Sequence, residues 1–189
     1  MVMRKRQQAP GELERVRQFV NTLEVDTGDE TLDGPSQLRD WLVESGLASR
    51  QIKVTRADLE RAIALREALR AILLAHNGGR APRAGAHRTL DEVARRASLE
   101  LRFDRHGGAS VQPAAGGVDG ALGRLLAIVH GAIAEGSWAR LKACRDPSCE
   151  WAFYDNTKNR SGAWCTMDVC GNRAKARTYR DRHTASVPQ

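Results

Sequence analysis

Aromatic residues are scarce in this sequence of 189 residues. They make up 5% of the chain, whereas all hydrophobic residues together reach 41%, and alanine, leucine and arginine are abundant. A hydrophobic fraction of this size can fill a core, and this composition favours helices. The length fits one domain, or one domain joined to a small module.

Long apolar runs are also missing. The longest candidate, LLAIVHGAIA, is shorter than the ~20 residues that a membrane-spanning helix needs, so we expect no membrane partner. The N-terminal stretch MVMRKRQQAPGE is basic but has no apolar segment behind it, which predicts a cytoplasmic protein without a secretory signal. In that reducing compartment, cysteines are metal ligands or free thiols more often than disulfides.

The sequence lacks the common catalytic motifs. It contains no phosphate-binding glycine loop, no nucleophile elbow and no zinc motif that leaves a coordination position open. Its five histidines are scattered, and the glycine-rich stretch HNGGRAPRAGAH lies between two expected helices rather than after a strand. We therefore predict that the protein is not an enzyme and has no catalytic residues.

Positive charge is concentrated near the C-terminus. Residues 140–189 hold ten Lys or Arg against five Asp or Glu, a net charge of +5, and residues 1–139 contribute the other +2 of the total of +7. This asymmetry indicates a polyanionic partner for the basic end, although an arginine-rich end can also serve only for solubility.

Hydrophobic spacing predicts a mainly α-helical fold of the α+β class with one β-hairpin at residues 98–113. Pro35 can begin a helix that Gly46 ends, and Thr55 with Asp58 forms a capping box for the next one. The expected helices cover residues 12–25, 35–45, 56–76, 87–98 and 117–136.

The character of the sequence changes near residues 136–140, where alanine and leucine give way to cysteine, tryptophan and arginine. We therefore expect four parts. A basic flexible arm, a helical domain, a small zinc module and a tail occupy residues 1–11, 12–136, 140–183 and 184–189.

Cysteine is absent until residue 144 and then occurs as two pairs with the same spacing. Each pair reads C-x4-C, and fifteen residues separate the pairs; the four are Cys144, Cys149, Cys165 and Cys170. Four thiolates converging tetrahedrally predict one structural zinc ion per chain, with no position left for a catalytic water. We expect the intervening WAFYD and NTKNRSG stretches to form a small hairpin between two zinc knuckles. The alternatives are free thiols, an iron–sulfur cluster or a redox disulfide pair.

The segment after the last cysteine predicts a basic helix. Arg173, Arg177 and Arg180 share one face, and Lys175, Tyr179 and Arg182 share a neighbouring face. Arginine forks suit phosphates and guanine edges, so we predict DNA contacts from these Arg and Lys residues; the alternative is a solvated helix. One short helix gives modest affinity unless the protein forms a homodimer.

Three polar residues interrupt the apolar faces of the expected helical domain. Asn21 and Thr22 follow an apolar stretch, and Arg66 interrupts the long third helix. One hypothesis is that they line a pocket for a small effector. The alternative is that they hydrogen-bond to each other or cap a neighbouring helix.

The residues CRDPSCEWAFYDNTKNRSGAWCTMDVCGNRAKARTYRDR resemble the CGNR zinc finger, which is named for the tetrapeptide at residues 170–173. FVNTL, LRDWLVESGL and ALREALRAIL, all in the N-terminal part, are similar to the ABATE domain, a stress-induced transcription regulator domain. The resemblance implies a bacterial protein, zinc held by the four cysteines, and regulation of transcription through DNA binding.

The resemblance also suggests roles for neighbouring polar residues. Asn172 can support the zinc ligands by bonding to the knuckle backbone, whereas Arg173 can do the same or face DNA. Arg160 lies in the expected turn, where it can contact phosphate or only form the turn. We thus predict a DNA-binding transcription regulator that a small ligand can gate. A protein-interaction adaptor with a purely structural finger, or an RNA-binding protein, is the alternative.

Overall fold

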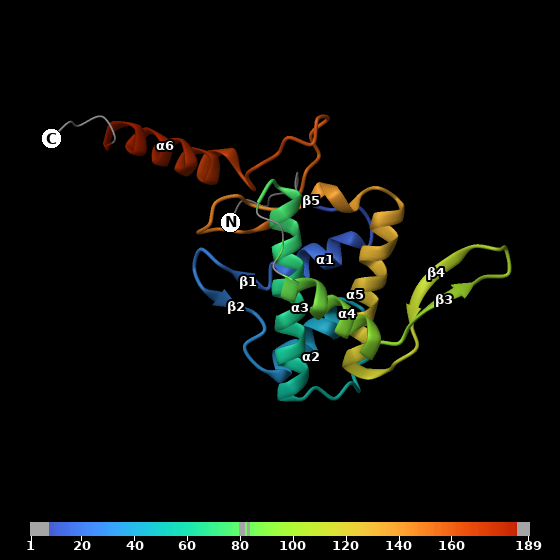
Figure 1. The fold of residues 1–189 in the computed structure, drawn as a ribbon. Coiled ribbons are helices and arrows are strands. Elements are labelled where there is room, and N and C mark those ends of the chain that lie inside the picture. The colour runs from blue at the N-terminus through green and yellow to red at the C-terminus, as the bar shows by residue number, and fades with distance from the viewer. Residues whose placement is uncertain (1–7, 80–81, 83, 185–189) are drawn as a thin grey trace.

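The computed structural model describes residues 8–79, 82 and 84–184 (Figure 1). Most of the arm and tail predicted at residues 1–11 and 184–189 therefore lies outside the described residues. The N-terminal body is helical, as predicted, and its helices are α1 Leu13–Val20, α2 Pro35–Glu44, α3 Arg56–His76, α4 Ala84–Arg96 and α5 Gly117–Ala134.

In the described part of the chain, three two-stranded antiparallel ladders accompany these helices. They pair β1 Leu23–Glu24 with β2 Asp29–Glu30, β3 Leu99–Phe103 with β4 Ala109–Pro113, and β5 Leu141–Ala143 with β6 Ala152–Tyr154. The C-terminal segment also contains a 3-10 turn Trp138–Arg140, a π-helical turn Met167–Gly171 and the helix α6 Asn172–Thr184.

Local signals explain why α2 and α3 form where the sequence predicts them. Pro35 stands in the first turn of α2, and Gly46 follows its end with φ +70°, a left-handed conformation that glycine adopts without strain. Thr55 and Asp58 form the predicted capping box, in which each side chain bonds to the other residue's backbone N–H.

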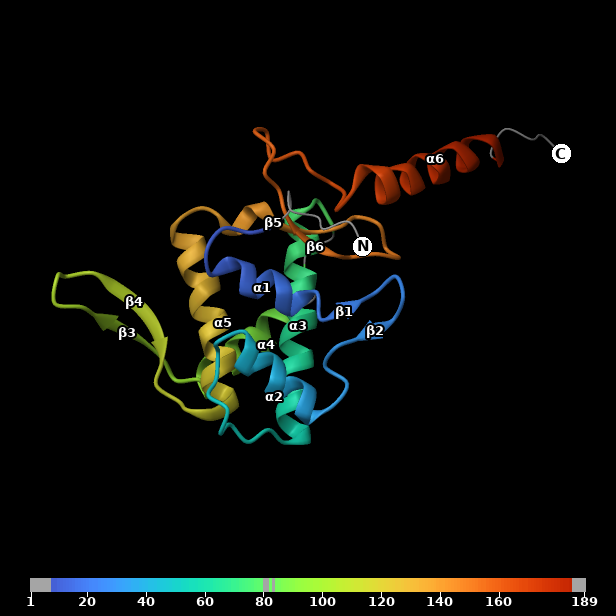
Figure 2. The ribbon, with the colours of Figure 1, turned by 180° about the vertical axis from the view of Figure 1, so that it is seen from behind.

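The central helices α3 and α5 carry the core. Leu65, Leu69 and Leu125 have no exposed surface. Gly123 lets α5 lie directly against the base of the β3–β4 hairpin, because a Cβ at this position would stand 2.4 Å from the Cβ of Ala97 and 3.0 Å from that of Pro113. The hairpin itself forms as predicted and projects away from the helices (Figures 1 and 2).

Helix α5 is longer than the apolar run that the sequence shows. Its 18 residues have a mean hydropathy of 1.3, which by length and composition alone is enough to cross a membrane. Half of this helix is buried among the other helices, with which it forms the core. In this fold, the apolar composition of α5 is therefore that of a helix in the core.

Helix α1 ends earlier than predicted. It stops at Val20 rather than continuing to residue 25, and the chain turns at Gly28 so that β1 can pair with β2. The Thr22 hydroxyl donates to the carbonyl of Phe19, 2.8 Å away, which satisfies one of the carbonyls left open at the helix end.

The hairpin near the cysteines differs from the prediction. The strand Ala152–Tyr154 does not pair with residues that follow it but with Leu141–Ala143, which precede the first cysteine. All six residues of this ladder are buried, and β5 packs against α3. Contact with the helical body thus favours the upstream partner, and the hairpin encloses the first cysteine pair rather than separating the two pairs.

Candidate metal centre

The four cysteines lie on two separate turns that meet at one point. Their sulfur atoms all lie within 4.8 Å of one another, and all four residues are buried. The Sγ atom of Cys165 is 3.6 Å from the Sγ atoms of both Cys149 and Cys170. These distances are too long for disulfides, but a zinc ion bound tetrahedrally at about 2.3 Å would separate its sulfur ligands by about 3.8 Å.

The first turn, residues 144–149, is shaped by Asp146. Its carboxylate accepts hydrogen bonds from the backbone and the hydroxyl of Ser148, and its carbonyl accepts from the backbone N–H of Cys149 at 2.9 Å. Glu150 then takes a left-handed conformation with φ +47°, which turns the chain back into β6. Both cysteines of this pair therefore face the same side of the turn.

The second turn carries Cys165 and leads into the π-helical turn that contains Cys170. The backbone N–H of Gly171 bonds to the carbonyl of Thr166 at 3.1 Å, and the Asn172 side-chain amide donates to the carbonyl of Asp168 at 2.9 Å. Asn172 therefore contacts the backbone of this turn, in the position considered for it from the sequence.

Crowding of the four thiols controls their ionisation. Hydrogen bonds from Cys149 and Cys165 lower the pKa of Cys144, and the bond to Cys144 raises the pKa of Cys149. The same contacts raise the pKa of Cys165, and burial raises that of Cys170. Four thiolates at these separations repel one another, so a cation between them is needed to keep all four ionised.

This donor set fits a structural zinc ion. Four buried sulfur atoms at tetrahedral separations match zinc and leave no coordination position open. The prediction of one zinc ion per chain is confirmed to this extent: the four cysteines lie close together and can hold one ion.

Side chains of the helical body hydrogen-bond to the backbone of the cysteine-bearing segment. Asn21 bonds to both the N–H and the C=O of Ala152, at 2.7 and 2.9 Å, as a neighbouring strand would. The buried Asn77, at the end of α3, donates to the carbonyls of Ala143 and Ala163 at 2.7 and 2.8 Å. One side chain of the body thus joins the two halves of the metal-binding segment.

A buried ion pair fixes the loop between β6 and the second cysteine pair. The Lys142 ammonium donates to the Asp155 carboxylate at 2.7 Å and also to the carbonyls of Arg160 and Gly162. Thr157 and the backbone N–H of Gly162 also donate hydrogen bonds to this carboxylate. The pair is almost fully buried and determines the path of the whole loop.

The first turn of α6 is tied to acidic partners. Arg173 donates to both oxygens of Asp26 at 3.1 Å, and Arg177 donates to the Asp146 carboxylate at 3.1 Å. Asp146 belongs to the first cysteine turn and Asp26 to the turn between β1 and β2. Two of the arginines that the sequence assigns to DNA therefore bond within the protein.

The other basic residues that the sequence assigns to DNA lie on α6 and in the loop after β6. Lys175 and Arg180 are exposed on α6, which extends away from the body (Figures 1 and 2). Arg160 is exposed in the loop that Lys142 holds, with φ +52°. The side chain of Arg182 lies outside the described residues.

The three residues considered for an effector have partners inside the protein. Arg66 is 2% exposed and bonds to Thr22 at 3.2 Å and to Glu30 at 2.6 Å, while Asn21 bonds to β6 as described above. These contacts match the alternative in which the polar groups satisfy one another. Hydrogen bonds to Glu30 and Glu67 raise the pKa of the Arg66 guanidinium against the opposing effect of burial.

Local sequence patterns did not single out Asp26, Asn77, Lys142, Asp146 or Asp155. Asp155 and Thr157 do lie within the stretch that resembles the CGNR zinc finger, and this resemblance was the available signal for the Lys142 ion pair. The other contacts join segments far apart in the chain.

Comparison with known families accounts for nearly the whole chain. A family model described as "CGNR zinc finger" matches residues 140–183, and one named ABATE, described as "Putative stress-induced transcription regulator", matches residues 14–136. Neither description names an enzyme. No curated protein matches this sequence.

Proposed function

The chain belongs to the ABATE family and carries a CGNR zinc finger, and from this premise we propose that it regulates transcription by binding DNA through the finger. Cys144, Cys149, Cys165 and Cys170 hold the zinc ion, which supplies a fixed centre for the two turns around it. As in the sequence analysis, we place this activity in the cytoplasm of a bacterium.

The observation that carries the proposal is the placement of α6. This helix follows directly from the turn that contains Cys170, and Arg173 and Arg177 bond its first turns to acidic residues of the body and the first cysteine turn. The metal centre and these two ion pairs fix its direction, and the rest of the helix projects from the body with basic residues exposed (Figure 2).

Ion pairing and position along α6 separate the basic residues that we assign to the polyanion from those that orient the helix. Arg173 and Arg177 share one face and bond to carboxylates, whereas Lys175 lies about 200° around the helix from Arg173. Arg180 lies on the same face as Arg173 but about two turns further along, on the part of α6 that projects from the body (Figure 2). We therefore assign phosphate contacts first to Lys175 and Arg180, and give Arg173 and Arg177 the role of orienting the helix.

Replacing Lys175 and Arg180 together with alanine should lower DNA affinity at least tenfold. Each phosphate contact contributes about one unit to the slope of log affinity against log salt, so this slope should flatten by about two units. Titration of the zinc-loaded protein with a labelled duplex at several salt concentrations measures both effects, and mass spectrometry checks that zinc stays bound.

A matched control replaces Lys53 and Arg56, two exposed basic residues at the opposite end of α3 from the finger. It removes the same charge about 30 Å from the metal centre, given the rise of a 21-residue helix. Equal loss of affinity in both double variants would mean that net charge, not α6, governs binding.

The adaptor alternative has its own supporting observation. Met167 and Val169 expose about half of their surface on the π-helical turn, next to the ligand Cys170. Exposed apolar side chains suit a protein partner. If the wild-type protein binds neither random nor genomic DNA at low salt, the adaptor function replaces the regulatory one; preference for RNA over the same DNA sequence would favour the third alternative.

Gating by a small ligand is the finer part of the proposal. Asn21, Asn77 and Asp26 belong to the body, and each bonds to the finger or to α6. A ligand that shifts the body changes these bonds, and so changes the position of the DNA-binding helix. A population shift of this kind requires the ligand to prefer one arrangement over the other.

A further inference from the structure

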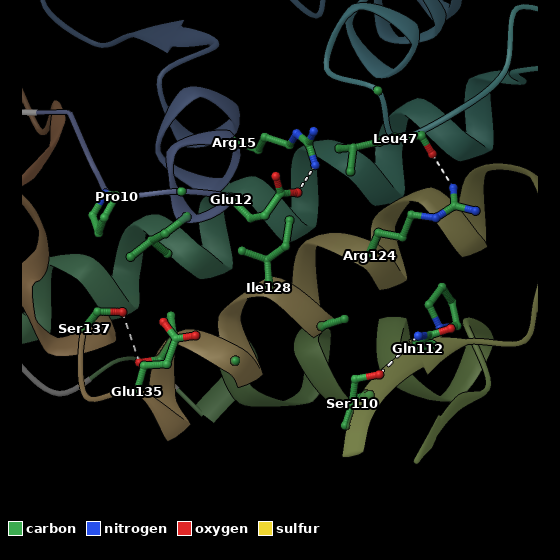
Figure 3. Close-up of a pocket in the computed structure, with 18 residues that line it drawn as sticks. Pro10, Glu12, Arg15, Leu47, Ser110, Gln112, Arg124, Ile128, Glu135 and Ser137 are labelled. Atoms are coloured by element: carbon green, nitrogen blue, oxygen red, sulfur yellow. Dashed lines mark hydrogen bonds and ion pairs between the residues drawn. The ribbon is translucent and has the colours of Figure 1, made fainter. Parts of the chain in front are cut away.

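A large open pocket lies on the helical body (Figure 3), and none of the four cysteines lines it. Its volume of about 720 Å³ is within the range of small-molecule sites. Four segments distant in sequence line it: residues 10–15 before and within α1, the turn at residues 46–47, strand β4, and α5 with the residues that follow it.

Two guanidinium groups stand at one end of this pocket. Arg124 of α5 donates to the carbonyl of Leu47, and Arg15 reaches the adjacent Gly46, where its Nη2 atom lies 3.6 Å from the position of a Cβ. Arg15 is paired with Glu12, whereas Arg124 has no carboxylate partner among the residues that the structure describes. The other carboxylate of the lining, Glu135, lies at the opposite end of the pocket from Arg124 (Figure 3), so the positive charge of Arg124 has no carboxylate beside it among the described residues.

Apolar side chains line part of the remaining wall. Leu13, Val111 and Ile128 contribute hydrocarbon from α1, β4 and α5. Gln112 adds an amide near the same end as Arg124 (Figure 3). A cationic group beside an apolar wall is complementary to a molecule with an acidic head and a hydrocarbon body.

We propose that this pocket binds a small organic carboxylate, with its acidic group on Arg124 and its hydrocarbon part against Ile128, Val111 and Leu13. This pocket is the site of the ligand that gates DNA binding in the proposed function. Ligand binding itself does not rest on that function; only its effect on transcription does. Ser137 also lines the pocket and directly precedes Trp138, whose ring contacts His76 at the end of α3. The occupied site thus adjoins the junction with the finger.

Two variants remove different features of the site. Arg124→Gln removes the charge from an exposed side chain. Gly131→Leu fills the pocket from α5, because a Cβ at this position meets no atom within 4 Å and the φ angle is an ordinary one. The control is Arg95→Gln, which removes an exposed arginine of α4 outside the pocket.

The test uses the full zinc-loaded chain without DNA and the carboxylates from acetate to octanoate, with octanamide as the neutral match. Calorimetry should show saturable octanoate binding that is at least tenfold tighter than acetate or octanamide binding. Arg124→Gln and Gly131→Leu should each weaken it at least tenfold, and Arg95→Gln should leave it unchanged.

Absence of saturable octanoate binding would overturn the proposal, and so would equal binding of octanamide or an unchanged affinity in Arg124→Gln. A dimer that Gly131→Leu dissociates in sedimentation would assign the pocket to a second copy of the chain instead. Because the assay contains no DNA, its failure leaves the DNA-binding proposal intact, and failure of DNA binding leaves the pocket result intact.

Discussion

Replacing Cys165 with serine should release the zinc ion and unfold the segment around it, while the helices of the body remain folded. The cluster at this site has few residues to hold it together: the four cysteines and Phe153, with Trp151 and Trp164 packed at its edge. A structural zinc ion contributes on the order of 10 kcal/mol to the folding of a small module, far more than these contacts can replace.

Native mass spectrometry measures the loss of one zinc ion, and hydrogen exchange locates the unfolding. Protection should disappear in residues 144–151 and 155–171. It should persist in α3 and α5, which belong to a separate core. Met167→Ser is the control, because it changes an exposed residue of the same turn without removing a sulfur ligand. A C165S protein that keeps its zinc would contradict the four-cysteine assignment.

Asp155→Asn should lower the free energy of unfolding by about 3–5 kcal/mol at pH 7. The substitution removes the charge that faces Lys142, and an ammonium group left in a buried site without its carboxylate carries a large desolvation cost. Urea unfolding of the zinc-loaded proteins measures the difference. Asp168→Asn, an exposed aspartate of the same finger, should cost little.

The Lys142–Asp155 ion pair predicts that the free energy of unfolding depends on pH. Burial alone would raise the pKa of Asp155, but hydrogen bonds from Lys142, Thr157 and Gly162 outweigh it and lower the pKa to about 2. Since the pKa falls on folding, the carboxylate contributes about 2 kcal/mol above pH 5, and this contribution is lost as the pH falls from about 4 through 2.

The difference in unfolding free energy between wild type and Asp155→Asn should therefore stay constant from pH 7 to 5 and shrink below pH 4. Acid also releases zinc by protonating the thiolates, and the Asp168→Asn protein measured at each pH shows the size of that separate effect. A difference that grows on acidification would contradict the assigned direction of the shift.

Local signals made parts of this structure predictable from the sequence. The Thr55–Asp58 capping box, Pro35 and Gly46 each act within a few residues, so the bounds of α2 and α3 could be anticipated. The β3–β4 hairpin was predictable because its alternation of apolar and polar residues brackets a short turn. Paired cysteine spacing likewise predicted the metal centre.

Contacts between distant segments were not predictable in the same way. The sequence predicted that the strand Ala152–Tyr154 pairs with residues that follow it. The partner is instead Leu141–Ala143, which packs against α3. Helical spacing placed Arg173 and Arg177 on one face correctly, but it could not reveal Asp26 as a partner, 147 positions earlier in the chain. Two arginines of α6 therefore have partners within the protein that helical spacing could not reveal.

The β5–β6 hairpin has a consequence for how such proteins can be rearranged. Leu141, Ala143, Ala152 and Tyr154 belong to the same core as the helices of the body. A gene fragment encoding residues 140–183 alone would carry the metal ligands but leave this apolar side without cover. The finger therefore does not form a unit that can be separated from the body. Recombination that moves it to another regulator must move α1 and α3 with it, or supply a surface of the same shape.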